Sequence, residues 1–365
     1  MTAQFDIAVI GAGIAGASIA AELAQSVRVV VLEAEAQPGY HTTGRSAAFW
    51  EECYGGPEIV PLTLASGHYL REHGMLSPRG ALYIAHEADR EEAERFRDRF
   101  KASGVTIEPL GRDALAALVP GIRDAWSVAL SQPACADIDV GGLHQHYLAL
   151  ARQGGAELRA HARVSAIERE GSGWLLSTER GDEVRAAVVV NAAGAWADTV
   201  AGLAGARPIG IQPLRRTVAQ LRTDPAPPAT LPLVLDLRGA FYFKPESGRV
   251  WLSPHDETPS LPCDAAPEEM DVALAIDRFE SVVDWRIEAV EHKWAGLRSF
   301  APDRLPVYGF DPACPGFFWF AGQGGYGIQT APAAARLAVQ LLLDRPRDRL
   351  TEALDATLYA AVRFR

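Results

Sequence analysis

Residues 5–33 read FDIAVIGAGIAGASIAAELAQSVRVVVLE, and this stretch decides the fold. Its first six residues form a short apolar run, as expected for a strand buried on both faces of a parallel sheet. The glycine-rich segment GAGIAG at 11–16 follows, and the Ala- and Leu-rich segment 17–26 predicts a helix. The run VRVVVLE at 27–33 predicts a second buried strand. The stretch therefore predicts a strand–helix–strand unit of an α/β fold.

Three glycines and one acid in this unit predict a dinucleotide site. Gly11 permits a tight turn, Gly13 lets the backbone approach a pyrophosphate, and Gly16 lets the helix pack closely on the strand. The helix N-terminus directs its free N–H groups at the phosphates. Glu33 ends the second strand, where a carboxylate accepts hydrogen bonds from a ribose and repels a 2′-phosphate. A lone GxGxxG is weak evidence, but here the strand, the helix and the acid all lie at the expected positions around it.

The order of strand, glycine turn and helix returns later in the chain. The buried run AAVVVNAAG ends at Gly194, and residues 315–344 read as a strand, the turn GQGGYG and a helix. Between these pieces we expect helices at 89–101, 111–120, 141–155 and 268–283, a β-meander at 162–194, a strand at 211–222 and a hairpin at 240–254.

This arrangement predicts an α/β fold, α+β overall, with two domains. One is a Rossmann-like nucleotide-binding domain assembled from discontinuous segments, and the other is a β-sheet-rich substrate-binding domain inserted between them. The expected boundaries are 1–80, 139–208 and 303–365 for the first domain, and 81–138 and 209–302 for the second.

The bulk composition of the 365-residue chain excludes several classes of protein. The net charge of −11 disfavours nucleic-acid binding, which needs a positive footprint. No apolar run approaches the roughly 20 residues that span a bilayer. The N-terminus lacks the pattern of a signal peptide, so we expect a cytoplasmic protein. The four cysteines are scattered, without a CxxC pair or a histidine at metal-ligand spacing, which predicts reduced thiols and no metal site.

The segments around the glycine loop favour FAD over NAD. A dehydrogenase that uses NAD would continue with further strand–helix repeats, whereas a Gly-, Ser- and Thr-rich segment, charged helices and a meander follow here. The second glycine turn, at 322–327, precedes a helix. The N-terminal dipole of that helix can stabilise negative charge on the pyrimidine end of a reduced flavin.

Seven segments resemble one family along essentially the whole chain. They are GAGIAGAS, VVVLEAEAQPGYHTTGRSAA, ADIDVGGLHQHYL, VVVNAAGAWAD, FYFKP, WAGLRSFAPD and GGYGIQT. Together they resemble the FAD-dependent D-amino-acid oxidase family, with particular similarity to its bacterial D-arginine dehydrogenase branch at PGYHTTGRSAA, NAAGAWAD, AGLAGARPIGIQP and WAGLRSF. The resemblance implies oxidative deamination of D-amino acids. In that reaction hydride passes from the substrate Cα to flavin N5, and the imine is hydrolysed to a 2-oxo acid and ammonia.

The resemblance also implies which residues hold FAD. In chain order they are Gly11, Gly13, Ile14, Ala15, Gly16, Glu33, Ala34, Thr42, Thr43, Gly44, Arg45, Ser46, Ala47, Val164, Ala193, Gly194, Trp196, Gly324, Gly325, Tyr326, Gly327 and Ile328. The turn at 324–328 is expected over the pyrimidine ring. Cys314 precedes the last strand and does not match the thiolate that binds flavin covalently in some relatives, so non-covalent FAD is expected.

On the substrate side, the resemblance implies that Arg216 and Arg298 clamp a carboxylate, helped by the hydroxyls of Tyr54 and Tyr242. The chemistry agrees, because a guanidinium is a planar fork that fixes the carboxylate of an α-amino acid at two points. The lone pair of a neutral amine drives hydride departure, so no strong protein base is required. Arg215 is expected to face outward, because adjacent strand residues point to opposite faces.

The chain departs from relatives that take cationic D-amino acids. Those relatives carry a carboxylate where residues 80–82 are Gly-Ala-Leu, and a histidine where this chain has Phe49. A buried cationic side chain without a partner is unfavourable, so we expect a neutral or apolar amino-acid substrate. A cationic substrate stays open if Glu51 or Glu52 points into the pocket. Residues 49–54, which begin with Phe49, are interpreted as a lid.

Other functions stay open at this point. The strand RVWLSP at 249–254 lacks the lysine that activates oxygen in sarcosine-oxidase-like relatives, which favours a dehydrogenase. The electron acceptor is then a quinone, another acceptor, or oxygen. A secondary-amine or imino-acid oxidoreductase would use the same carboxylate clamp, whereas a 2-hydroxy-acid dehydrogenase would need a base. A tRNA-modifying oxidase domain, or a subunit of a hetero-oligomeric complex, is the alternative from a different class.

Overall fold

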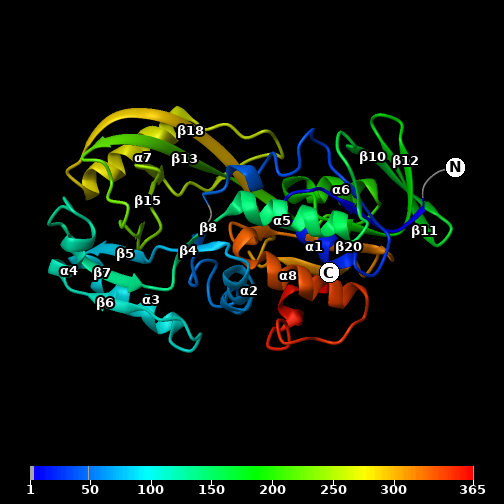
Figure 1. Ribbon diagram of the computed structural model, residues 1–365, viewed down its shortest axis with the longest axis horizontal. Helices are drawn as coiled ribbons and strands as arrows, with labels where there is room; N and C mark the ends of the chain where they lie inside the picture. The colour runs from blue at the N-terminus through cyan, green and yellow to red at the C-terminus, as the bar shows by residue number, and fades with distance from the viewer. Residues whose placement is uncertain (1–3, 48, 365) are drawn as a thin grey trace.

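The computed structural model describes residues 4–47 and 49–364. Two large β-sheets lie toward opposite ends of an elongated molecule, and helices cover each of them (Figure 1). The two long strands β13 (Gln212–Asp224) and β18 (Arg286–Phe300) run from one end toward the centre (Figure 1). Among the described residues, none of the helices has both the length and the apolar character needed to cross a membrane.

The first sheet contains the strand–helix–strand unit predicted from residues 5–33. Its central strands run in parallel, β1 pairing with both β2 and β12, and β12 pairing with β20. Its strands are β1 (Gln4–Ile10), β2 (Val29–Leu32), β9 (Glu157–Arg159), β10 (Val164–Glu170), β11 (Gly173–Thr178), β12 (Glu183–Asn191), β19 (Val307–Phe310) and β20 (Phe317–Ala321).

Both faces of this sheet are covered, which explains why its strands read as continuous apolar runs. On one face, α1 lies between α5 and α8, and α8 also contacts α2; α6 packs near β12 on the other side. Phe318 and Phe320 of β20 belong to the core on one face, and Phe317 and Trp319 belong to the core on the other. These helices are α1 (Ile14–Leu23), α2 (Val60–Glu72), α5 (Val140–Gln153), α6 (Ala197–Leu203) and α8 (Gly327–Leu342).

The second sheet is mostly antiparallel, and α7 packs against β13 and β16. Strands β13 and β18 pair along almost their whole length. The other strands are β5 (Ala81–His86), β6 (Glu108–Leu110), β7 (Trp126–Gln132), β14 (Leu233–Asp236), β15 (Tyr242–Glu246), β16 (Arg249–Ser253), β17 (Thr258–Pro259) and β21 (Gln323–Gly324). The helices of this half are α3 (Arg90–Phe100), α4 (Arg112–Leu118) and α7 (Glu269–Val282).

A small third sheet corrects the interpretation of residues 49–54 as a lid. It consists of β3 (Phe49–Trp50), β4 (Leu76–Pro78) and β8 (Ala136–Ile138), and β8 pairs with both other strands. Phe49 and Trp50 are buried, and Cys53 is buried with them. A segment that pairs in a sheet and packs in the core does not act as a lid, so that interpretation is wrong.

Candidate active site

One cavity of about 540 Å³ joins the two halves of the molecule. At one end it is lined by the glycine loop and by Glu33, and at the other by Arg216 and Tyr242 of the second sheet. Of the residues expected to hold FAD, the cavity lining includes Gly11, Gly13, Ile14, Ala15, Glu33, Ala34, Thr42, Thr43, Arg45, Ser46, Ala47, Val164, Ala193, Gly194, Trp196, Gly324, Gly325, Gly327 and Ile328. The residues expected to bind substrate, Tyr54, Arg216, Tyr242 and Arg298, also line it.

Three expected cofactor residues, Gly16, Gly44 and Tyr326, lie outside this lining and make packing contacts, which for Gly16 is the role that the glycine spacing predicts. A side chain at Gly16 would overlap the carbonyl oxygen of Gly11, so this glycine lets α1 approach β1 closely. A Cβ at Gly44 would lie 2.8 Å from the carbonyl oxygen of Gly39. The ring of Tyr326 is buried against Tyr54, and its hydroxyl donates to a backbone carbonyl. Direct side-chain contact of Tyr326 with a ligand in the cavity is not supported.

The glycine loop is held in place by a carboxylate and an imidazole. Glu33 is buried, and its Oε2 accepts from the backbone N–H of Ala12 at 2.7 Å while its Oε1 accepts from Glu35 N at 2.9 Å. The Nε2 of His144 lies 2.8 Å from the carbonyl oxygen of Ala12. Burial lowers the pKa of His144, so the ring is a neutral donor there. His144 is not among the residues predicted from the sequence, although it lies within the segment ADIDVGGLHQHYL.

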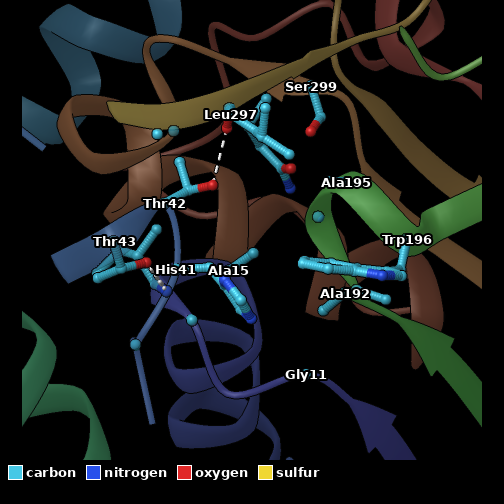
Figure 2. A pocket seen from close by; sticks show the side chains of 18 of the residues that line it. Gly11, Ala15, His41, Thr42, Thr43, Ala192, Ala195, Trp196, Leu297 and Ser299 are labelled. Atoms are coloured by element: carbon cyan, nitrogen blue, oxygen red, sulfur yellow. Dashed lines mark hydrogen bonds between the residues drawn. The ribbon is translucent and has the colours of Figure 1, made fainter. Parts of the chain in front are cut away.

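The loop that follows Glu33 docks on β18. Thr42 Oγ1 donates to the carbonyl oxygen of Leu297 at 2.7 Å, and Thr43 Oγ1 accepts from Ile14 N at 2.9 Å (Figure 2). Arg45 donates to the carbonyl oxygen of Ala265 at 2.8 Å and forms an ion pair with the neighbouring Asp264. The guanidinium of Arg45 therefore ties the cofactor loop to the second half of the molecule.

Two aromatic rings from distant segments meet across the cavity. His41 lies beside the N-terminal end of α1, and Trp196 lies opposite it (Figure 2), with 4.7 Å between their ring centroids. The Nε2 of His41 pairs with Glu35 at 3.1 Å, whereas its buried Nδ1 has no protein partner among the described residues. His41 is thus a polar group available to a ligand at the glycine loop.

The strand register brings the two predicted arginines together. Arg216 of β13 lies opposite Gly296 of β18, and Arg298 lies opposite Leu214. Arg298 is two residues beyond Gly296, so both guanidiniums project from the same face of the sheet. Arg215 points the other way and pairs with acids near α7, as the alternation predicts.

Arg216 is a buried cation whose hydrogen-bond donors are not all paired. Its side chain is 5% exposed, and its Nη1 has no hydrogen-bond partner among the described residues although the atom is buried. Burial, together with the nearby charge of Arg298, lowers the pKa of Arg216 to about 10. A buried cation with an unused donor, next to a second cation, is a site for an anion such as a carboxylate.

Three aromatic rings close this end of the cavity. Phe49 contacts the edge of Tyr242, with 5.6 Å between the centroids, and lies 6.2 Å from the ring of Tyr54. The guanidinium of Arg298 lies over the ring of Tyr54, 5.3 Å from its centroid. A Cβ placed on Gly325 would overlap the Tyr54 hydroxyl, so this glycine leaves the room that Tyr54 and Arg298 occupy.

Glu51 and Glu52 do not line the cavity. Glu51 is buried, its Oε1 accepts from Cys53 N at 2.9 Å, and burial raises the pKa of this carboxyl to about 7. Glu52 accepts a hydrogen bond from the side chain of Gln132 at 3.2 Å. The acids that line the described cavity are at the glycine-loop end: Glu33, Glu35 and Glu179.

The residues present fit a dinucleotide flavin. The left-handed backbone of Gly11 (φ +99°), where an added Cβ would lie 2.6 Å from the carbonyl oxygen of Ala192, leaves a shallow cradle at the start of α1. The second glycine turn borders the same cavity near the arginine pair. A glycine loop, a buried acid at the end of the second strand and a continuous cavity that leads to an arginine pair are the features expected of an FAD-dependent oxidoreductase.

Within this class, the chain belongs to the DAO family of FAD dependent oxidoreductases, whose model matches residues 6–341. Glycine oxidase from Geobacillus kaustophilus is 26% identical over 360 residues, which cover 94% of each chain. Its crystal structure matches with a TM-score of 0.84 at 24% identity over 98% of both chains. L-proline dehydrogenase from P. horikoshii has a TM-score of 0.84 at 22% identity, covering 100% of this chain and 98% of that one.

A third structure carries the cofactor itself. L-alpha-glycerophosphate oxidase from Mycoplasma pneumoniae, with FAD bound, has a TM-score of 0.85 at 18% identity and covers 94% of this chain and 95% of its own. The family membership and the mixed α/β fold are as the sequence predicts, and FAD is the cofactor.

Proposed function

We propose that this protein catalyses the FAD-dependent oxidative deamination of D-amino acids that have neutral or apolar side chains. The observation that carries the proposal is the buried Arg216, whose Nη1 is unused and whose charge lies next to that of Arg298. The substrate carboxylate would relieve the repulsion between the two cations and supply the missing acceptor.

The chain's own residues would then orient the substrate. Arg216 and Arg298 would hold the carboxylate, and the hydroxyls of Tyr54 and Tyr242 border the same space. FAD bound in this cavity would supply the acceptor for the hydride of Cα. The rings of Phe49 and Tyr242, both less than a tenth exposed, would exclude water from this end while donor and acceptor are held together.

The substrate amine would enter the reaction uncharged, without a strong protein base. His255 lies behind Tyr242, with 5.7 Å between the ring centroids, and its Nδ1–H donates to the carbonyl oxygen of Gly239 at 2.7 Å. Burial and the charges of Arg216 and Arg298 lower the pKa of His255 to about 2, so it is a poor proton acceptor. His255 also lies outside the cavity lining, so it does not supply the base that a 2-hydroxy-acid dehydrogenase would need.

The preference for a neutral side chain rests on the distribution of acids. The carboxylates that line the described cavity lie at its glycine-loop end, and Glu51 and Glu52 make their contacts away from the cavity. A cationic side chain held beside Phe49 and Tyr242 would lack a partner, which is unfavourable. We therefore do not expect D-arginine or D-lysine to be the best substrate.

Dehydrogenase activity and non-covalent FAD are parts of the same proposal. The lining of the described cavity contains neither a lysine, which would activate oxygen, nor a cysteine, which would bind the flavin covalently. Cys314 lies elsewhere, with its thiol near the carbonyl oxygen of Ala204. We further propose the two-domain division 1–80, 139–208 and 303–365 against 81–138 and 209–302, which largely follows the membership of the two large sheets.

A second candidate is the oxidation of a secondary amine or imino acid, because the chain resembles glycine oxidase in sequence and L-proline dehydrogenase in fold. The test mixes anaerobic, FAD-loaded protein with D- and L-amino acids, sarcosine, proline and 2-hydroxy acids, and follows the loss of the visible absorbance of oxidised flavin. Fast bleaching by neutral D-amino acids supports the proposal. Faster bleaching by proline or sarcosine would favour the second candidate, and D-arginine as the best substrate would refute the neutral-side-chain proposal.

A further inference from the structure

The guanidinium of Arg216 is held from one side by two consecutive residues, Asp256 and Glu257, that immediately precede β17. Its Nε donates to the backbone carbonyl of Asp256 at 2.8 Å, and its Nη2 lies 3.5 Å from Glu257 Oε1. Only Nη1 is left without a protein partner among the described residues. We propose that Asp256 and Glu257 are positioning residues that orient Arg216 so that Nη1 is offered to the substrate carboxylate.

Asp256 is fixed to the same strand that carries Arg216. Its Oδ1 accepts from the backbone N–H of Thr217 at 2.7 Å, and its Oδ2 accepts from the Thr217 hydroxyl at 3.0 Å. Thr217 is the next residue after Arg216 on β13. The carboxylate therefore locks the 256–257 segment to β13, and the carbonyl of Asp256 then reaches Nε with little freedom left in between.

Glu257 links Arg216 to the second glycine turn. Its Oε1 also accepts from Arg304 Nη2 at 2.7 Å. The guanidinium of Arg304 lies over the ring of Phe300, 4.0 Å from its centroid, and the backbone carbonyl of Arg304 accepts from the Tyr326 hydroxyl. Tyr326 precedes α8 in the second glycine turn, which borders the cavity near the arginine pair. The orientation of Arg216 is thus coupled to the turn that follows β20.

This inference deepens the proposed function, because it rests on Arg216 as a carboxylate ligand. It predicts that removing Glu257 weakens carboxylate binding, whereas simple electrostatics predicts that it strengthens binding. If Glu257 acted only as a nearby negative charge, removing it would strengthen carboxylate binding. If Glu257 positions Arg216, removing it lets the guanidinium turn and weakens binding, and a glutamine, which keeps the acceptor oxygen, restores most of it.

The experiment measures the dissociation constant of acetate, as a simple carboxylate, from the change in flavin absorbance of the FAD-loaded protein. Glu257→Ala is expected to weaken acetate binding about tenfold, the effect of losing one hydrogen bond to a charged group, and Glu257→Gln to stay within about threefold of the parent. Glu268→Ala is the matched control: Glu268 pairs with Arg215, the neighbour that faces away from the cavity, and its loss should change nothing.

Equal or tighter acetate binding by Glu257→Ala would overturn the inference, as would equal weakening in Glu257→Ala and Glu268→Ala. The readout also separates the two proposals. If no amine reduces the flavin but acetate binding still depends on Glu257, the proposed reaction fails and the positioning role stands. If amines reduce the flavin and Glu257→Ala leaves both acetate binding and KM unchanged, the reaction stands and the positioning role fails.

Discussion

A single methyl group added at Gly325 should disable the carboxylate site without disturbing the fold. A Cβ built there lies 2.9 Å from both Cζ and Nε of Arg298 and overlaps the Tyr54 hydroxyl. These atoms are the far ends of flexible side chains, so they move and the backbone does not. The backbone of Gly325 is outside the left-handed region, so an alanine adds no backbone strain there.

The size of the effect follows from the distance that Arg298 must move. Ordinary contact with a Cβ begins near 3.4 Å, so the guanidinium is displaced by at least the difference from 2.9 Å, which is about 0.5 Å. A misplacement of about 1 Å in a positioning group costs about 100-fold in rate, so we expect Gly325→Ala to lower kcat/KM between about tenfold and 100-fold.

The assay compares FAD content, acetate affinity and anaerobic flavin reduction in the parent, Gly325→Ala and Gly202→Ala. Gly202 lies in α6 with no atom within 4 Å of an added Cβ, so it controls for the chemistry of the substitution. Gly325→Ala should retain its FAD and lose acetate affinity. Full kcat/KM and full acetate affinity in a variant that keeps its FAD would refute this account of the site.

Three further predictions concern cofactor binding, stability and pH. Glu33→Ala removes the carboxylate that holds the glycine loop, and should raise the FAD dissociation constant about tenfold or more in a fluorescence titration; an unchanged constant would contradict the assigned role. Lys244→Met breaks an ion pair with Asp137 at 2.7 Å, but Asp137 keeps Arg79 as a second partner, so the free energy of unfolding in urea should fall by roughly 1–3 kcal/mol, the cost of one charged hydrogen bond, and by less when Asp137→Asn is already present. Burial raises the pKa of Glu51 to about 7, so the folded state holds a proton that the unfolded state has lost, and stability falls as pH rises from 4.5 to about 7. Glu51→Gln should remove that slope and be more stable than the parent by roughly 2–3 kcal/mol at pH 8, with little difference near pH 4.5; parallel pH profiles of the two proteins would refute it.

The first strand–helix–strand unit is predictable because its signals are local. The apolar runs, the glycine spacing and the acid all lie within 29 residues, 5–33, and the structure has β1, α1 and β2 there. The hairpin of β15 and β16 is predictable for the same reason, since its turn joins neighbouring segments. In these places the sequence pattern and the tertiary structure demand the same conformation.

The features that the sequence does not predict, β18 and the pairing of Phe49 and Trp50, depend on strands that are distant in the chain. The sequence pattern predicts no strand at β18, where exposed and half-buried residues alternate from Arg286 to Val290 and apolar burial starts only near Ala295. Its partner β13 lies far earlier in the chain, so no local sequence signal indicates the pairing. The lid interpretation of Phe49 and Trp50 fails similarly, because β8, which pairs with them, follows only at Ala136.

The pairing of β13 and β18 explains the positions of Gly296 and Arg298 in the motif WAGLRSF. Alternation places Arg215 and Arg216 on opposite faces, and the resemblance predicts that Arg216 is the one that faces the cavity. The register sets Arg216 opposite Gly296, on the same face as Arg298. Gly296 has no side chain, and a Cβ there would lie 3.4 Å from Arg45 Cβ, an ordinary contact distance, so the cofactor loop packs directly against this position of the strand. Arg298 follows two residues later on the same face. The docking point of the cofactor loop and the carboxylate site are therefore separated by one strand repeat, roughly 7 Å, which the pairing of the two strands holds fixed.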